Sequence, residues 1–359
     1  MLTRKKTFQI NKIFTLVATG LLLCAVLTGC AKEPSAPEKA APYDGKEYLQ
    51  QSELTAAGED PDSAFDSYTV INNYDSALSV PTYVTKADDL WFIVDCYHNR
   101  IIYTDSLGVP LNDWKIMCDQ ATQPHTMASD GIVYMVEDTE NNRVLVFEKR
   151  DNKFINTQSF YDIGSRPHFT VYDETSDTFY VWSSITGELY CFRHTPDSTR
   201  MYLTEVRKID QLSGLYVRSF TIVGDDIYFV SGVSATGAAA QILKCDLKTL
   251  NIKKSYPVPD ELAGMVQITP IDDMFYITVS TDITGNQDYA TLIRTSSLDK
   301  LSKGDYEDIY AKYFVGGGTP YNISKVDDTY FLTEHRLQGH SIWSFKVESG
   351  EITDVTALY

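Results

Sequence analysis

The sequence predicts an all-β fold, a six-bladed propeller of four-stranded antiparallel blades, and two observations lead to it. First, an apolar strand that follows an aspartate recurs six times along the chain. Second, each copy lies among other short strand patterns, with no long helical pattern between copies. A propeller repeats such four-stranded units around a central channel.

The repeated strand is apolar at nearly every position, as in DDLWFIVD, SDGIVYMVED and DDIYFVSG. The marker aspartates are spaced 41, 47, 49, 47 and 55 residues apart, within the range of propeller blades. A single unit could not cover both faces of such a strand, so the units are expected to stack around an axis. The six markers are Asp89, Asp130, Asp177, Asp226, Asp273 and Asp328. The residues predicted to form hairpin turns are the pairs Asp88-Asp89, Asp225-Asp226, Asp272-Asp273 and Asp327-Asp328.

Three further strands complete each unit. One precedes the marker, as in PHFTVYD; one follows after a loop, as in RVLVFEK; and a more polar one comes last, as in YLTEVRKI. A two-sheet sandwich is the competing architecture, and six evenly spaced copies disfavour it. The ring would close through either the terminal EITDVTALY or the segment FDSYTVINNYDSALS before the first blade, and the sequence leaves this choice open.

The N-terminus has the features of an export signal. Four basic residues precede an apolar run from Ile13 to Leu27, which is too short for a membrane-spanning helix and ends in LTGC at Cys30. This pattern resembles the signal of bacterial lipoproteins, whose cysteine is acylated and becomes the new N-terminus; the alternative is a plain secretory signal. The resemblance implies a leader over residues 1–29, lipidation of Cys30, and a location on the extracytoplasmic face of the cell membrane, held there by lipid alone.

The segment after Cys30 is rich in Ala, Pro, Glu and Lys and has no apolar periodicity. Such a composition cannot bury a core and is typical of an extended tether. We therefore expect the lipidated cysteine and a flexible linker over residues 30–65 and the propeller over residues 66–359.

The acidic composition limits the partners of the chain. It carries 31 basic and 49 acidic residues, a formal charge of −18, and removing the leader with its four basic residues would lower this charge to −22. A chain this acidic repels the backbone of nucleic acids and anionic lipid headgroups. No nucleic-acid partner is expected, and no membrane contact other than the lipid anchor.

The cysteines predict no metal centre, because no CxxC pair or metal-like Cys/His spacing occurs. Cys191 and Cys245 lie inside apolar strand patterns and are expected to be buried. The sequence leaves open whether Cys96 and Cys118 form a disulfide.

The first two blades also contain a motif. In VDCYHNRIIYTD and VEDTENNRVLVFE an Asp is followed four residues later by Asn-Arg: Asp95 with Asn99-Arg100, and Asp138 with Asn142-Arg143. This motif resembles the NHL repeat, and the other four blades lack the Asn-Arg pair. The resemblance implies the propeller fold, with Asn and Arg as turn and packing residues. NHL-type propellers include binding platforms, lyases and lactonases, so the resemblance does not select a function.

Candidate site residues come from aligning the six units. The crossovers enter the innermost strands at Thr82, His125, His168, Arg218, Val266 and Tyr321, a column that opens on the channel where propellers usually bind ligands. The loops after the marker strands lie at the same end and add Asp95, His98, Glu137, Asp138, Trp182, Asp282, Glu334 and His335. The candidate ligand-binding residues are His125, His168, Arg218, Tyr321, Glu334 and His335.

Three interpretations of these residues remain open. Arg218, the histidines and Tyr321 could bind an anionic or sugar-like ligand. His125 and His168, with His335 and a carboxylate such as Glu334, could instead hold a divalent metal; their Pro-His pairs resemble virginiamycin B lyase, a propeller enzyme that uses a channel histidine and magnesium. In the third interpretation they only line the channel.

The function predicted is a membrane-anchored binding or interaction module for a glycan, peptide or envelope protein. No GxSxG, HExxH or P-loop motif occurs, so no catalytic residue and no cofactor is predicted. The alternative is a metal-assisted lyase or hydrolase that uses the central channel mouth.

Overall fold

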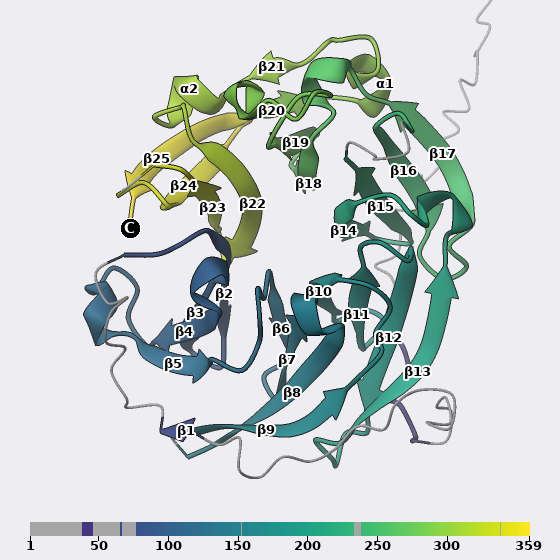
Figure 1. The fold of residues 1–359 in the computed structure, drawn as a ribbon, viewed down its shortest axis with the longest axis vertical. Helices are drawn as coiled ribbons and strands as arrows, with labels where there is room; N and C mark the ends of the chain where they lie inside the picture. The colour runs from purple at the N-terminus through teal and green to yellow at the C-terminus, as the bar shows by residue number, and fades with distance from the viewer. Residues whose placement is uncertain (1–37, 46–64, 67–76, 152, 233–237, 338) are drawn as a thin grey trace, which may run out of the picture. The chain divides into compact units, whose positions relative to one another are not determined.

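Six antiparallel sheets surround a central axis (Figure 1). The structure is a computed structural model that describes residues 38–45, 65–66, 77–151, 153–232, 238–337 and 339–359. In every sheet four strands follow one another in chain order, each paired with the next by antiparallel hydrogen bonds. The predicted all-β, six-bladed propeller is confirmed.

In the first three blades the strands follow one another from the channel outwards. Blade 1 contains β2 (Pro81–Ala87), β3 (Leu90–Asp95), β4 (Arg100–Thr104) and β5 (Lys115–Cys118). Blade 2 contains β6 (Met127–Ser129), β7 (Val133–Asp138), β8 (Arg143–Arg150) and β9 (Lys153–Phe160). Blade 3 contains β10 (Pro167–Asp173), β11 (Thr178–Ser183), β12 (Glu188–His194) and β13 (Met201–Lys208).

The other three blades follow the same order. Blade 4 contains β14 (Val217–Val223), β15 (Asp226–Ser231), β16 (Gln241–Asp246) and β17 (Ile252–Pro257). Blade 5 contains β18 (Met265–Ile271), β19 (Met274–Val279), β20 (Thr291–Thr295) and β21 (Glu307–Asp308). Blade 6 contains β22 (Thr319–Val326), β23 (Thr329–His335), β24 (Ile342–Glu348) and β25 (Glu351–Ala357).

Helices are short and lie in the connections. The α-helices are α1 (Leu298–Leu301) and α2 (Tyr310–Tyr313). The described 3₁₀ turns are η3 (Cys96–His98), η4 (Leu111–Asp113), η5 (Thr139–Asn141), η6 (Asp210–Leu212), η7 (Asp260–Leu262) and η8 (Gln287–Tyr289). Within the described ranges, no helix has the length and apolar character needed to cross a membrane.

Apolar side chains fill the contacts between neighbouring blades. Every residue of β7 and of β11 is buried, because neighbouring blades cover both faces of these strands. Between blades 3 and 4, for example, the Trp182 ring packs 4.4 Å from that of Phe229. The continuous apolar pattern of the marker strands therefore reflects their position between two blades.

The hairpins that join the first two strands of the blades use aspartate as predicted. Asp88 and Asp89 both have positive φ, 49° and 60°, and Asp177, Asp272 and Asp327 also lie in the left-handed region. Tight hairpin turns need this conformation, and Asp adopts it more readily than most residues.

The ring closes by side-chain packing. The terminal segment forms β25, the outer strand of blade 6, and β1 (Phe65–Asp66) pairs with β9 of blade 2. The expectation that one of these segments pairs across the ends of the ring is therefore wrong for the described residues. Instead, the Tyr359 ring packs on Trp114 of blade 1, and its hydroxyl donates to the carbonyl of Val109 at 3.0 Å.

Part of the expected linker lies on blade 3. The Tyr43 ring is buried beside Tyr202, with centroids 5.7 Å apart, and the Arg193 guanidinium lies 5.4 Å from the Tyr43 centroid. Arg193 also donates to the carbonyl of Ala41 at 2.7 Å. Residues 38–45 are thus fixed to the propeller, whereas Cys30 and the predicted leader lie outside the described residues.

The four described cysteines are free thiols. Cys191 and Cys245 are buried among apolar neighbours, as predicted. Cys96 and Cys118 are also buried and free, so the disulfide left open by the sequence is not formed.

Candidate functional site

The Asp/Asn-Arg motif holds the chain where it enters the channel. In blade 1, Asp95 accepts a hydrogen bond from the backbone N–H of Ser79 at 2.7 Å. Asn99, at φ 54°, reaches forward and accepts from the N–H of Gln123 at 2.9 Å. Arg100 neutralises Asp95 at 2.7 Å. The motif therefore joins the start of its own blade to the start of the next one.

The second copy repeats these contacts one blade further on. Asp138 accepts from the N–H of Thr122 at 2.7 Å, and Asn142 accepts from the N–H of Arg166 at 2.8 Å. Arg143 neutralises Asp138 at 2.5 Å. The two residues held by asparagine, Gln123 and Arg166, each lie two positions before a candidate histidine.

The chain bends at the held residues. Gln123 and Arg166 have φ values of 53° and 59°, and each precedes a proline; Val80 in blade 1 has the same conformation. These strained positions place Thr82, His125 and His168 at equivalent points of three adjacent blades. All three side chains are buried.

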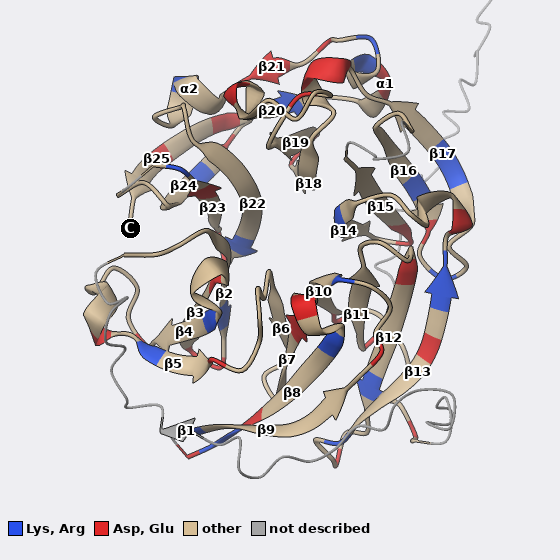
Figure 2. Cartoon of the chain, in the orientation of Figure 1, with Lys and Arg blue, Asp and Glu red and all other residues tan. Residues whose placement is uncertain are grey.

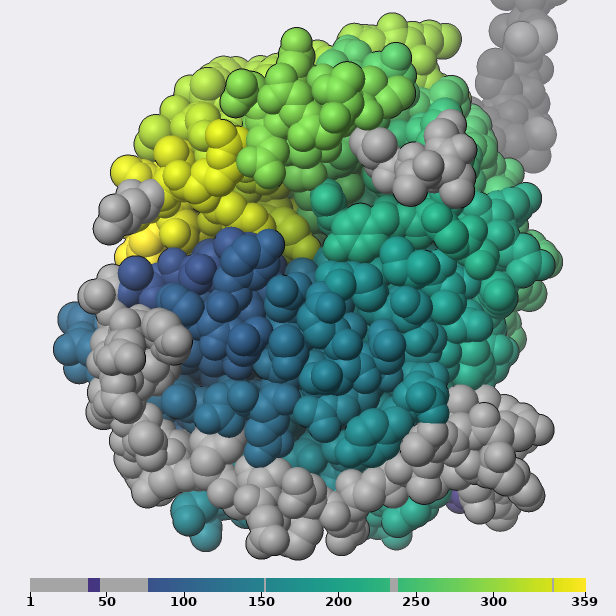
Figure 3. Space-filling view, in the orientation of Figure 1, coloured from purple at the N-terminus to yellow at the C-terminus, as the bar shows by residue number. Residues whose placement is uncertain are grey.

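A pocket of about 360 Å³ opens at this end of the channel, and we call it the mouth pocket. Residues of all six blades or their connections line it, including His125, Tyr321 and His335. In the space-filling view, side chains close most of the centre of the ring (Figure 3). Three arginines contribute to the wall, Arg166, Arg218 and Arg336, and none of the described lining residues is Asp or Glu.

This local charge contrasts with the rest of the chain. Acidic residues are spread over all six blades (Figure 2), and the formal charge of the sequence is −18. A cationic pocket in an acidic protein favours an anion at one place on its surface.

Four aromatic rings form a stack along one side of the mouth pocket. His125 lies 3.6 Å from His168, with an interplanar angle of 25°. Tyr321 follows at 6.2 Å from His125, and His335 lies 4.8 Å from Tyr321, both nearly parallel. The structure thus brings together four of the six predicted ligand-binding residues.

Both nitrogens of His125 are used within the protein. The Thr139 hydroxyl donates its proton to the carbonyl of Pro167 at 2.8 Å, so its oxygen accepts from His125 Nδ1 at 3.0 Å. The other nitrogen, Nε2, faces the thiol of Cys96 at 3.7 Å. Burial, followed by the nearby His168, lowers the pKa of His125 well below its usual value.

His168 is fixed in the same way. Its Nδ1 donates to the carbonyl of Arg218 at 2.9 Å, and its Nε2 accepts from the Tyr216 hydroxyl at 3.0 Å. Burial lowers the pKa of His168 to about 3, and the Arg218 charge contributes in the same direction. Both stacked histidines are therefore neutral at pH 7, with their proton on Nδ1.

The stacked histidines do not fit a metal site. A metal ligand needs a free imidazole lone pair, and the lone pairs of His125 and His168 are directed at Cys96 and Tyr216. Over the described ranges, no group of three or more His, Cys, Asp or Glu side chains is arranged to hold a metal ion. The magnesium implied by the lyase resemblance therefore finds no ligand set among these residues.

The three arginines differ in how they are neutralised. Arg166 pairs with Glu140, and Arg336 lies 3.9 Å from Asp288 while donating to the carbonyl of Gln287. Among the described residues Arg218 has no carboxylate partner: it donates to the Ser280 hydroxyl at 2.7 Å, and its guanidinium lies 5.1 Å from the Tyr216 centroid. Of the three arginines, Arg218 is thus the one whose charge is most available to bind a ligand.

Glu137 lies directly behind the stack. The sequence placed it at this end of the channel but not among the candidate ligand-binding residues. Its carboxylate accepts from the backbone N–H groups of His125 and Thr126 and from the Thr170 hydroxyl at 2.9 Å. Burial raises the pKa of Glu137 to about 7. The sequence signal for a special role of Glu137 was its position at the end of the otherwise apolar marker strand GIVYMVED.

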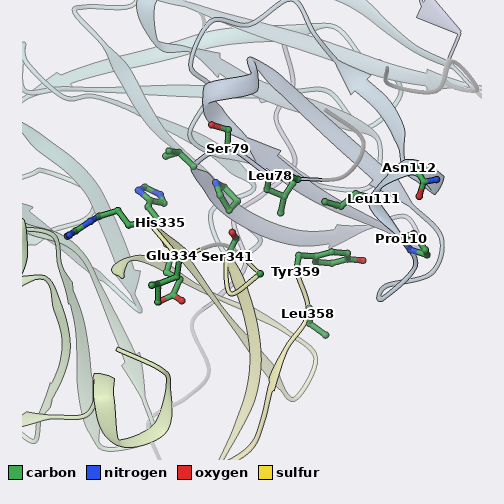
Figure 4. A pocket seen from close by; sticks show the side chains of 16 residues that line it. Leu78, Ser79, Pro110, Leu111, Asn112, Glu334, His335, Ser341, Leu358 and Tyr359 are labelled. Atoms are coloured by element: carbon green, nitrogen blue, oxygen red, sulfur yellow. The ribbon is translucent and has the colours of Figure 1, made fainter. Parts of the chain in front are cut away.

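Glu334 lies apart from the mouth pocket. Its carboxylate accepts from the Trp343 indole N–H at 2.9 Å and from the Tyr310 hydroxyl, inside the contact between blades 5 and 6. Burial raises its pKa. The backbone and side chain of Glu334 instead border a second pocket of about 890 Å³ at the seam between blades 1 and 6 (Figure 4).

This seam pocket adjoins the mouth pocket. Val80, His335 and Arg336 line both. Its wall is more apolar, with Leu111 of blade 1 and Leu358 near the end of the chain (Figure 4).

Comparisons with known proteins identify the fold alone. No protein-family model and no curated protein matches the chain. Among solved structures, a protein of Bacteroides uniformis assigned as a 6-phosphogluconolactonase has a TM-score of 0.54 at 13% identity, covering 78% of this chain and 85% of its own. A streptogramin B lyase has a TM-score of 0.51 at 14% identity, covering 81% and 85%. A hydrazine synthase of Kuenenia stuttgartiensis has a TM-score of 0.51 at 12% identity, covering 77% and 80%.

Proposed function

We propose that this chain is a lipid-anchored, extracytoplasmic propeller that binds a small anionic ligand in the mouth pocket. The observation that carries the proposal is Arg218, whose guanidinium has no carboxylate partner among the described residues and lies in a pocket that no described Asp or Glu lines. Guanidinium groups bind carboxylates and phosphates through two parallel hydrogen bonds. The anchor rests on the lipoprotein-like signal that ends at Cys30.

A binding role agrees better with the site than the metal-assisted lyase or hydrolase. Fold neighbours include a lyase and a protein assigned as a lactonase, so the fold by itself permits catalysis. In this chain, however, the histidines that such a reaction would use are neutral and have both nitrogens engaged. We assign them to the wall of a preformed pocket.

The binding proposal is tested by calorimetric titration of the full chain in neutral detergent. The probes are D-glucuronate, glucose 6-phosphate, cyclohexanecarboxylate and inorganic phosphate. At least one should bind, more weakly at high salt, and Arg218→Gln should lower that affinity at least about tenfold because a charge-assisted contact is lost. Arg200→Gln is the matched control, since Arg200 is exposed and lies outside the pocket. Binding that is absent, or equal in Arg218→Gln and wild type, would refute the proposal.

The anchor needs a separate test. Radioactive palmitate should label the wild-type chain in cells and leave Cys30→Ser unlabelled, and the variant should leave the membrane fraction. A wild-type chain that stays unlabelled and soluble would contradict the anchor without affecting the binding proposal.

A further inference from the structure

Three buried polar atoms at the mouth pocket have no hydrogen-bond partner among the described residues. They are the Thr82 hydroxyl oxygen, the Thr319 hydroxyl oxygen and Nε2 of His335. All three residues line the mouth pocket, on the side where blade 6 meets blade 1. Buried polar atoms in folded proteins are nearly always paired, so three on one wall indicate a group that pairs with them.

The chemistry of His335 defines that group further. Burial lowers the pKa of His335 to about 4, and a hydrogen bond to the backbone of Pro81 partly opposes this shift. Because proline has no N–H, this bond runs from the imidazole to the Pro81 carbonyl. Nε2 is unpaired, so the proton donated to Pro81 is on Nδ1, and Nε2 carries a lone pair. His335 therefore requires a hydrogen-bond donor.

A simple carboxylate cannot satisfy both sides of the pocket. Arg218 of blade 4 requires an acceptor with negative charge, and carboxylates and phosphates supply it. A carboxylate has no hydrogen to donate to His335, whereas phosphate near neutral pH still carries a P–OH group that can donate. A ligand that carries an anionic group and also hydroxyl groups satisfies both, since each hydroxyl donates and accepts and can therefore pair with Thr82 and Thr319 as well.

We infer that the ligand is an acidic sugar, a hydroxylated ring with one carboxylate or phosphate, held by Arg218 at its charge and by Thr82, Thr319 and His335 at its hydroxyls. This inference rests on the proposed function and names its ligand class. The pocket volume of about 360 Å³ is near the lower end of ligand sites, which span roughly 300–1,000 Å³, and suits a single sugar ring.

Two pairs of probes test the inference in the full chain. D-Glucuronate is compared with cyclohexanecarboxylate, which has a six-membered ring and a carboxylate but no hydroxyls. Glucose 6-phosphate is compared with inorganic phosphate. In at least one pair the sugar should bind at least about tenfold more tightly than its partner, because several hydrogen bonds distinguish them. The pair that discriminates shows whether the anionic group is a carboxylate or a phosphate.

Variants assign the preference for the sugar to two of the three atoms. Thr82→Val and His335→Phe keep the shape of the side chain and remove the polar atom. Each should weaken the discriminating sugar about two- to tenfold and leave the binding of cyclohexanecarboxylate, which has no hydroxyls, unchanged. Thr329→Val is the matched control, since Thr329 lies at the other end of β23. Melting temperatures show whether each variant is folded.

The outcomes separate this inference from the proposed function. If both members of each pair bind equally and depend on Arg218, the pocket binds anions without reading hydroxyls, so the inference is wrong and the proposed function stands. If a sugar is preferred but Thr82→Val and His335→Phe bind it like the wild type, the hydroxyl contacts are wrongly assigned. If nothing binds in an Arg218-dependent way, both fail.

Discussion

Glu137 gives the sharpest prediction about the stability of the propeller. Its carboxylate is fully buried at the inner strands of blades 2 and 3, where it accepts hydrogen bonds from His125, Thr126 and Thr170. Replacing it with glutamine keeps an oxygen for the two backbone donors. The new amide N–H can donate to the Thr170 hydroxyl, which is able to accept. Glu137→Gln therefore removes the charge with little change to the contacts.

The expected magnitude follows from the pKa of Glu137. Burial raises it from 4.5 to about 7, so native Glu137 keeps a proton that the unfolded chain has released between these two pH values. The free energy of unfolding of the wild type should then fall with rising pH across this window, by about 1.4 kcal/mol per pH unit and about 3 kcal/mol in all. Above pH 7 the buried charge persists as a full penalty, which glutamine does not have.

Urea denaturation at pH 5, 6, 7 and 8 measures this difference. Wild type and Glu137→Gln should agree within about 1 kcal/mol at pH 5, and the variant should be more stable by up to about 3 kcal/mol at pH 8. The pair between His194 and Asp130, at 2.6 Å, also weakens as rising pH deprotonates His194, but it is present in both proteins and cancels in the comparison. A variant that is less stable than wild type by the same amount at every pH would show that the carboxylate is stabilised as an anion.

Two further predictions concern the segments that hold the site and the linker. Asn142→Ala should lower the free energy of unfolding, measured in urea, by about 1–3 kcal/mol, because it removes the hydrogen bond to the Arg166 N–H and leaves alanine at φ 52°. Asn142→Gly should recover the part of this loss that comes from backbone strain. Equal losses in the two variants would contradict this prediction. Tyr43→Ala should release residues 38–45 from blade 3, so that trypsin cleaves at Lys39 at least several-fold faster than in wild type. Tyr43→Phe is the control, because it keeps the ring and should be cleaved like the wild type. Equal cleavage rates in all three proteins would show that Tyr43 does not hold this segment on blade 3.

The repeat made the fold predictable, because each blade buries the same kind of strand under the same constraint. Six apolar strands after aspartate turns could be counted from the sequence, and the turns indeed use Asp88, Asp89 and their equivalents at positive φ. Ring closure could not be predicted in this way. It depends on a buried cluster in which Val84 and Ile93 of blade 1 meet Phe331 and Ile342 of blade 6. The contact of Tyr359 with Trp114, between residues that no repeat aligns, adds to this cluster.

Aligning the blades also located the mouth pocket, but not the chemistry of its residues. The alignment brought five residues to one end of the channel: His125, Arg218, Tyr321 and His335 line the mouth pocket, and His168 stacks on His125 behind its wall. Whether an imidazole lone pair is free depends on partners from other parts of the chain, such as Tyr216 for His168. Sequence position cannot reveal such partners, and this is why the metal interpretation remained open until the hydrogen bonds were known.

The two motif copies and the histidine stack belong to one arrangement. Each motif asparagine reaches forward by one blade, so the copies in blades 1 and 2 hold the starts of blades 2 and 3, where His125 and His168 follow. Blade 4 enters the channel differently, through the 3₁₀ turn Asp210–Leu212 and Gly214, and has no motif asparagine before it. The motif is therefore found where two stacked rings must be held 3.6 Å apart, and its absence from the later blades does not weaken the fold. This links the repeat to the site: what distinguishes blades 1 and 2 in sequence is what holds the histidine wall, in which His168 donates to the carbonyl of Arg218.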